Sequence, residues 1–311
     1  MSYEQPRKHQ KFFISDDFEQ IYYAILNELK RNPEFTPNPR GIGSREITNL
    51  SFELTNPMNR MIWNKARDTN YEFAMKFWLW MINGDTDFSY VTGVNAKAAQ
   101  YDKQDAKAMP DNFSTAYGPR ILKQLPAILE ELRRDKDSRR AVMHILNEDD
   151  HRLLGVQTTQ EYPCTDSFSW MIRDDALYMY THMRSNNMVL TLVYDVFNMT
   201  MLHEFVWKSL KSTYPELKLG SYNTSCVSAH YFDREQELVD KILASEVSDE
   251  IGMSQKKAKP EFQLDRKPEY QPIVLKLAPT DVVPQKASEV VSGRAKPDYI
   301  SKVLNAITSK A

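Results

Sequence analysis

The period of the hydrophobic pattern changes several times along this 311-residue chain, and these changes constrain the fold more than any other feature. Helical spacing of apolar side chains predicts helices over residues 15–32, 71–82, 120–134 and 196–210. Short segments rich in β-branched and aromatic residues predict strands at 50–54, 141–146, 153–160, 167–172 and 176–183, and another around Cys226. This order is typical of an α+β domain with a mostly antiparallel sheet.

Local signals mark the ends of several predicted elements. Asp16 and Glu19 can form a capping box at the start of the first helix. Pro126 should lie in the first turn of its helix or kink it. Asp174 and Asp175 form a turn signal that joins the last two strands of the cluster as a hairpin.

Charge and composition favour a small-molecule ligand. The 40 lysines and arginines nearly balance the 42 aspartates and glutamates, for a net charge of -2, which gives no positive field for a nucleic-acid polymer. The chain has no Walker or dinucleotide glycine motif among its nine glycines, so a phosphate would be bound by arginines. Two cysteines are too few for a metal cage, and no metal site is predicted.

The predicted organisation is one large domain followed by a tail. We expect one main domain over residues 1–275 and a C-terminal extension over 276–311, with a linker at 278–296 and a short helix at 298–309. No signal peptide is evident at the N-terminus, and no segment approaches the roughly 18 apolar residues of a membrane span. A cytoplasmic protein without membrane contact is expected.

Cys164 is the strongest candidate for chemistry. Most free cysteines are small buried hydrophobic residues, and Cys226 is interpreted in that way. Cys164 differs because it opens a predicted strand and lies across the predicted hairpin from Arg184 and Ser185. A polar setting near a cation lowers a thiol pKa and makes the thiolate a nucleophile.

Five short motifs occur in an order that resembles the thymidylate synthase family. They are YG at 117–118, DSRR at 137–140, PC at 163–164, MRSNN at 183–187 and AH at 229–230. Within the family, CTDSFSWMIRD followed by THMRSNN is most similar to phage-type deoxycytidylate hydroxymethylases. The resemblance covers about residues 15–275. It implies a thymidylate synthase-like α+β fold with a mostly antiparallel or mixed sheet, packed helices and a sheet face that forms a dimer interface.

The resemblance also implies roles for individual residues. Cys164 would add to C6 of a pyrimidine nucleoside monophosphate, so that C5 attacks a one-carbon unit from 5,10-methylenetetrahydrofolate. The residues implied to bind the nucleotide are Arg40, Arg184 and Ser185 at the 5'-phosphate, Arg139 and Arg140 donated across a homodimer interface, His230 at the sugar, and Tyr117. Trp80 and Asn187 would contact the folate.

Asp195 stands where thymidylate synthases carry an asparagine that pairs with uracil. A carboxylate can accept hydrogen bonds from the 4-amino group of cytosine and from a protonated N3, but it would face O4 of uracil as an unpaired acceptor. That mismatch costs about 1 to 3 kcal/mol, so Asp195 predicts a cytidylate, dCMP or CMP. Asp195 could also be the N-cap of the helix predicted from residue 196.

Three positions depart from the family pattern. Phe77 stands at the place of the catalytic glutamate, Asn187 replaces the aspartate that binds the pterin, and Phe232 replaces a tyrosine near the sugar. The leading interpretation is hydroxymethyl transfer to C5 of dCMP or CMP. The alternatives are C5 methylation of the same nucleotide, or a nucleotide-binding homologue that has lost the transfer reaction.

Overall fold

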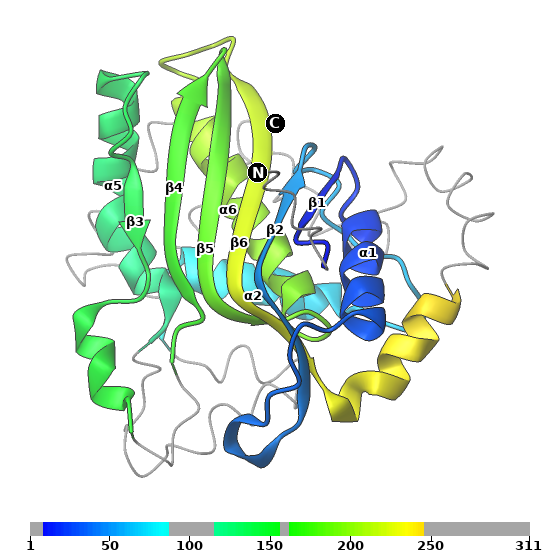
Figure 1. Cartoon of the computed structure of the whole chain (residues 1–311). Helices are drawn as coiled ribbons and strands as arrows, with labels where there is room; N and C mark the ends of the chain where they lie inside the picture. Colours follow the sequence, from blue (N-terminus) through cyan, green and yellow to red (C-terminus); the bar gives the residue numbers. More distant parts are fainter. Residues whose placement is uncertain (1–8, 87–114, 156–161, 246–311) are drawn as a thin grey trace, which may run out of the picture. The chain divides into compact units, whose positions relative to one another are not determined.

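The computed structural model describes residues 9–86, 115–155 and 162–245 (Figure 1). The predicted tail at 276–311, with its linker and helix, lies outside the described residues. The same is true of most of the strand predicted at 153–160, whose first residue instead ends a 3-10 helix, Glu148–Leu153.

Within the described residues, six strands form one mixed sheet in the order β1-β2-β6-β5-β4-β3. The strands are β1 Phe12–Ser15, β2 Ser44–Leu54, β3 Val142–His144, β4 Thr165–Arg173, β5 Ala176–Asn187 and β6 Lys218–Phe232. β1 pairs with β2 in parallel, whereas β2 with β6 and β3 with β4 are antiparallel. The predicted α+β class with a mixed sheet and packed helices is therefore confirmed, and the dimer interface on the sheet stays a prediction.

The chain divides into two compact units. The described part of the first unit comprises residues 9–69, 180–197 and 221–245. The described part of the second comprises 70–86, 115–155, 162–179 and 198–220. Strands β5 and β6 and helix α6 (Leu192–Leu210) contribute residues to both units.

In the first unit, helix α1 (Phe18–Arg31) buries one apolar face. Phe18, Ile21 and Ile25 are at most 1% exposed, and the Phe18 ring lies 6.3 Å from that of Phe52 in β2. The capping residue is Asp17, whose side chain accepts from the Glu19 amide, so the predicted cap at Asp16 is wrong by one residue. The short strand β1 was not predicted, because four residues are too few to show a period.

In the second unit, two helices pack closely. Helix α2 spans Tyr71–Ile82, as predicted, and α5 spans Tyr117–Arg134, starting three residues earlier than predicted. Pro126 consequently lies in the interior of α5 and not in its first turn. Gly118 allows a close approach, because a Cβ there would lie 2.4 Å from the Met81 carbonyl oxygen.

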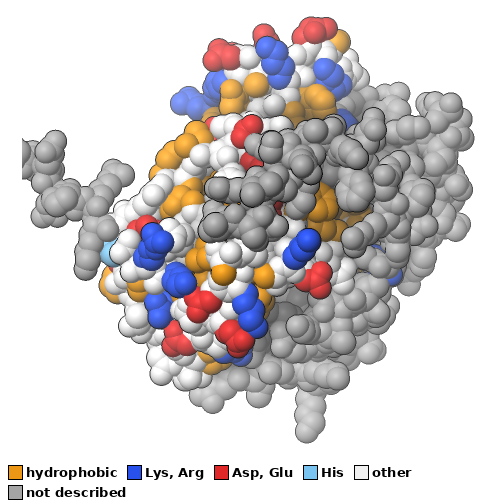
Figure 2. Space-filling model, turned by 90° about the vertical axis from the view of Figure 1, so that its right-hand side faces the viewer, with side chains coloured by type: hydrophobic (Ala, Val, Ile, Leu, Met, Phe, Trp, Pro, Cys, Tyr) orange, Lys and Arg blue, Asp and Glu red, His pale blue; other side chains and the backbone are white. Residues whose placement is uncertain are grey.

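The β4–β5 connection is the predicted hairpin turn. Asp174 and Asp175 both have positive φ, 49° and 57°, which is the backbone of a two-residue turn that suits the twist of a hairpin. None of the described helices is long and apolar enough to cross a membrane. On the face drawn in Figure 2, acidic and basic side chains of the described residues are interspersed, in keeping with the small net charge.

Candidate active site

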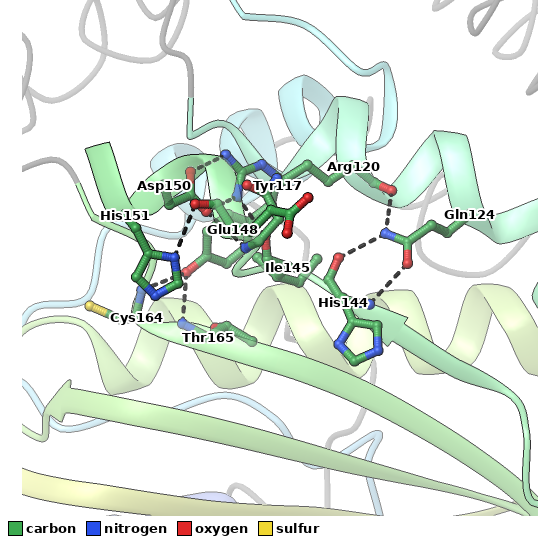
Figure 3. A network of polar contacts seen from close by, with 11 residues as sticks. Tyr117, Arg120, Gln124, His144, Ile145, Glu148, Asp150, His151, Cys164 and Thr165 are labelled. Atoms are coloured by element: carbon green, nitrogen blue, oxygen red, sulfur yellow. Dashed lines mark hydrogen bonds and ion pairs between the residues drawn. The ribbon is translucent and has the colours of Figure 1, made fainter. Parts of the chain in front are cut away.

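Cys164 lies directly before β4 in the second unit and is half-buried (Figure 3). Its backbone amide donates to the Tyr117 hydroxyl oxygen at 3.2 Å, and the amide of Thr165 donates to the same oxygen at 3.1 Å. Tyr117 is the first residue of α5. The Tyr117 hydroxyl thus holds the backbone at Cys164 through two consecutive amides, so Tyr117 positions the residue that carries the thiol.

A second contact fastens α5 to the segment before β4. Arg120 makes two bonds to the Asp150 carboxylate, at 2.6 and 2.7 Å, and one to the Ile145 carbonyl oxygen at 2.5 Å (Figure 3). Asp150 is 1% exposed, and burial would raise its pKa, but the bonds from Arg120 and the Asn147 amide prevail and lower it. The pair went unnoticed in the sequence because its members are 30 residues apart.

Gln124 makes a third contact, which joins α5 to β3 (Val142–His144). Its side-chain nitrogen donates to the His144 carbonyl oxygen at 2.7 Å, and its oxygen accepts from the His144 amide at 2.9 Å. The amide side chain therefore pairs with β3 as a neighbouring strand would. Tyr117, Arg120 and Gln124 together hold the surroundings of Cys164 against one helix (Figure 3).

Asp195 lies in the first turn of α6 and in the first unit. Since α6 begins at Leu192, the alternative that Asp195 is a helix N-cap is wrong. Burial raises the pKa of Asp195 to about 7, against the effect of hydrogen bonds with Asn186 and Thr191, which lower it. The carboxyl group therefore titrates near neutral pH.

Asn187, at the end of β5, uses its side chain inside the protein. Its nitrogen donates to Glu235 Oε2 at 2.8 Å, and its oxygen accepts from the amides of Val189 and Leu190 at 2.9 and 2.8 Å. Asn187 is 8% exposed. These bonds give it a structural role, and contact with folate stays a prediction.

The turn that follows Asn187 is held from a second side. Arg67 donates to the carbonyl oxygens of Val189 and Leu190 at 2.9 and 3.0 Å, and the Tyr22 hydroxyl donates to that of Val189 at 3.2 Å. The guanidinium also lies over the Tyr194 ring, 5.6 Å from its centroid. Because its amides and carbonyls are both bonded, this turn presents α6 and Asp195 in one orientation. No sequence motif indicated Arg67 or Tyr22.

His230, near the end of β6, is half-buried, and its Nδ1 lies 3.3 Å from the Ser228 carbonyl oxygen. Burial lowers its pKa; the Ser228 bond and the charges of Glu46 and Glu235 oppose that effect, while the charge of Arg184 adds to it. A neutral imidazole is therefore favoured. Its Nδ1–H donates to the Ser228 carbonyl oxygen, which leaves Nε2 as an acceptor for a ligand hydroxyl.

The family model described as Thymidylate synthase matches residues 20–274. The chain belongs to the thymidylate synthase family. The resemblance carried by the five motifs is thereby confirmed, and the mixed sheet with packed helices agrees with it.

This member of the thymidylate synthase family is similar to two phage proteins. It is 26% identical over 235 residues to the deoxyuridylate hydroxymethyltransferase of Delftia phage PhiW-14, and 24% identical over 228 residues to that of Bacillus phage SP01. These alignments cover 72% and 68% of this chain and 63% and 56% of the phage proteins. A provisionally named thymidylate synthase of Methanococcoides burtonii is 23% identical over 237 residues, 71% of this chain and 89% of that protein.

The remaining residues matched to the thymidylate synthase family are distributed over both units. Arg40 is exposed in the short 3-10 helix Pro39–Gly41, with a φ of 54°, and Arg184 and Ser185 are half-buried in β5. Arg139 and Arg140 are exposed after α5, and Arg140 Nε lies 3.1 Å from Glu131 Oε1.

Trp80 is 1% exposed and packs on Phe77 with ring centroids 5.4 Å apart. Its contact with folate stays a prediction. Among the described residues, no group of three or more histidines, cysteines, aspartates or glutamates could hold a metal ion.

Proposed function

We propose that this member of the thymidylate synthase family transfers a hydroxymethyl group to C5 of a pyrimidine nucleoside monophosphate. The observation that carries the proposal is the half-buried Cys164 thiol, mounted on a backbone that Tyr117 holds at two consecutive amides. Covalent catalysis requires a nucleophile that is held in a fixed position, and the hydrogen bonds at Cys164 meet this requirement.

The chemistry follows from a covalent adduct at C6. The Cys164 thiolate adds to C6, and the electron pair displaced to C5 attacks the one-carbon unit of 5,10-methylenetetrahydrofolate. Loss of the C5 proton and release of tetrahydrofolate leave an exocyclic methylene on the base. Water adds to this methylene, and departure of Cys164 from C6 restores the ring, so no hydride is consumed.

Arginines would hold the substrate. Arg40 and Arg184, with the Ser185 hydroxyl, would bind the 5'-phosphate, because a guanidinium matches phosphate with two parallel bonds. Arg139 and Arg140, both exposed, would reach the phosphate of the other subunit in a homodimer. His230, favoured as a neutral imidazole, would bond a sugar hydroxyl.

For the base, the first choice is a cytidylate. An ionised Asp195 offers two acceptors to the 4-amino group and to a protonated N3 of cytosine. The second choice is deoxyuridylate, which the names of the two phage relatives favour. Methyl transfer is the alternative reaction, favoured by the archaeal relative, and would be recognised by dihydrofolate as the second product.

Release of tritium from C5 of labelled dCMP, CMP and dUMP tests the proposal. We expect release from at least one nucleotide when methylenetetrahydrofolate is present, and a product heavier than the substrate by one CH2O. Cys164→Ser should lower release at least about 10³-fold while the nucleotide still raises the melting temperature. Cys226→Ala, which removes the buried second thiol, is the matched control and should keep release.

Binding without tritium release in the unmodified protein would contradict the proposal. That result would favour a nucleotide-binding protein that has lost the transfer reaction, with Phe77 in place of the family's glutamate. Equal release from the Cys164 variant would instead exclude this thiol as the nucleophile.

A further inference from the structure

The carboxylate of Glu235, in the 3-10 helix Asp233–Glu235, has one oxygen with hydrogen-bond donors and one without. Its Oε2 accepts from the Asn187 side-chain nitrogen at 2.8 Å and from the Phe232 amide at 3.0 Å. Glu235 is 6% exposed, and its Oε1 is buried with no hydrogen-bond partner among the residues that the structure describes. Because a buried charged acceptor without a donor is costly, we expect a bound molecule to supply the donor.

The neighbours of Glu235 fix which acceptor is left for a ligand. Two bonds to Oε2 set the orientation of the carboxylate. The Asn187 oxygen already accepts from the amides of Val189 and Leu190, and the Asn187 nitrogen donates to Glu235. Asn187 therefore has no acceptor left to offer, whereas Glu235 has Oε1.

The chemistry of the two ligands in the proposed function indicates which one supplies the donor. The nucleotide already has a group for each of its parts, with arginines at the phosphate, His230 at the sugar and Asp195 at the base. The pterin ring of folate has an edge on which N3–H lies beside a 2-amino group, and both are donors. Asn187 cannot accept from this edge, but one carboxylate oxygen has two lone pairs and can accept from both groups.

We propose that Glu235 Oε1 accepts from the N3–H and 2-amino edge of the pterin ring, and that Asn187 holds this carboxylate in place. The inference rests on the proposed function, in which folate is the one-carbon donor. It assigns the negative charge at the folate to residue 235, with residue 187 as its support. Hydrogen bonds to a charged acceptor in a buried place are stronger than bonds between neutral groups, because water competes little there.

Titration calorimetry of tetrahydrofolate with the full chain, saturated with dUMP or dCMP, tests this. Glu235→Gln keeps the shape of the side chain. Its oxygen has to take the Oε2 position, where Asn187 and Phe232 both donate, so its amide nitrogen puts a donor in place of the Oε1 acceptor. We expect the affinity for tetrahydrofolate to fall about 10- to 100-fold and the affinity for the nucleotide to change less than about threefold.

Glu46→Gln is the matched control. Burial lowers the pKa of His230, and the charges of Glu46 and Glu235 both oppose that effect, so each variant removes one negative charge near the same imidazole. Glu46 accepts from the Ser228 hydroxyl, and its variant should keep the tetrahydrofolate affinity within about threefold. Equal losses for the two variants would mean that the effect passes through His230 and would overturn the direct contact.

A change in the ligand gives a second test that needs no variant. A tetrahydrofolate analogue with a methyl group in place of the 2-amino group should bind the unmodified protein about tenfold more weakly. Equal affinity for the two ligands would overturn the inference, as would an unchanged tetrahydrofolate affinity or a matching loss of nucleotide affinity in Glu235→Gln. These results would leave the proposed function intact, whereas no binding of tetrahydrofolate by the unmodified protein would contradict that function itself.

Discussion

At the scale of single residues, the amide of Asn187 suits the carboxylate of its neighbour Glu235. The resemblance to the thymidylate synthase family implies an aspartate at this position, but here Glu235 Oε2 lies 2.8 Å from the Asn187 nitrogen. Two carboxylates at that distance in a buried place would repel, whereas an amide supplies a donor. Glu235 also accepts from the Phe232 amide at 3.0 Å, which fixes its position.

Asn187→Asp should lower the free energy of unfolding by about 2 to 4 kcal/mol at pH 7.5, through a lost bond and like-charge repulsion. Asn56→Asp is the matched control, since Asn56 also accepts a backbone amide with its side-chain oxygen but is exposed. Adding Glu235→Gln to Asn187→Asp should recover most of the loss by exchanging the two roles. Denaturant unfolding measures each variant, and equal losses for Asn187→Asp and Asn56→Asp would contradict this account.

Asp195 should also make stability depend on pH. Its pKa in the folded protein, about 7, lies above the value of about 3.9 in an unfolded chain. A raised pKa means that its stabilising contribution is complete below about pH 4 and is lost as pH rises through 7. We expect the Asp195→Asn variant not to show this loss. The difference in the free energy of unfolding between the unmodified protein and the variant should change by about 2 to 4 kcal/mol from pH 4 to 8.

Denaturant unfolding at four pH values measures the free energy of unfolding of both proteins. In the difference between the two proteins, the contributions of other titratable groups cancel. His230 is one of these groups. Because its pKa is lowered in the folded protein, it stabilises the fold at pH values above the ordinary histidine pKa, and this contribution is lost as the pH falls. A difference that does not change with pH would mean that Asp195 has the same pKa in the folded and unfolded protein, and would contradict this prediction.

At the scale of elements, helix α5 positions the candidate nucleophile. Its residues Tyr117, Arg120 and Gln124 bond to the start of β4, to the segment before it and to β3. The helix itself is seated by Gly118 against the end of α2, where the Met81 carbonyl leaves no room for a side chain. The placement of Cys164 therefore depends on how closely these two helices approach.

Gly118→Ala should lower the free energy of unfolding by about 2 to 3 kcal/mol, because the overpacking strain exceeds the gain of about 1 kcal/mol in helix propensity. It should also lower the rate of C5 tritium release. The matched control is Gly155→Ala, where a Cβ meets nothing within 4 Å and only the φ of 79° adds strain, about 1 kcal/mol. Similar melting temperatures for the two variants would contradict the close approach at Gly118.

At the scale of the whole molecule, the proposed dimer makes each site depend on two subunits. Arg139 and Arg140 follow α5 and are exposed, as residues that serve a partner would be before assembly. If they act across the interface, a subunit lacking Cys164 can still supply arginines to an intact thiol in its partner.

Mixing tests this arrangement. Cys164→Ser and the double variant Arg139→Ala/Arg140→Ala should each show little tritium release alone. Unfolding and refolding the two together should recover about a quarter of the unmodified activity, since half of the dimers are mixed and each mixed dimer has one complete site. Recovery of no activity, with dimers present by light scattering, would place the arginines in their own subunit's site or outside any site.

Features that depend on neighbours in the chain could be predicted from the amino-acid sequence. The helix at 71–82 follows from apolar spacing, and the Asp174-Asp175 turn follows from residues that tolerate positive φ between two strands. The family followed from five motifs in order. Boundaries were predicted less well: α6 begins four residues before the prediction, which placed Asp195 at the helix cap although the buried Leu192 and Val193 extend the apolar spacing before it.

Tertiary structure alone decided the chemistry of individual side chains. The Arg120–Asp150 pair, the Tyr117 bonds at Cys164 and the Asn187–Glu235 bond join residues 30, 47 and 48 positions apart. The pKa of Asp195 likewise depends on burial among groups from two strands and a turn. Periodicity is a local property of the chain, whereas desolvation and hydrogen-bond partners are set by segments that meet only when it folds.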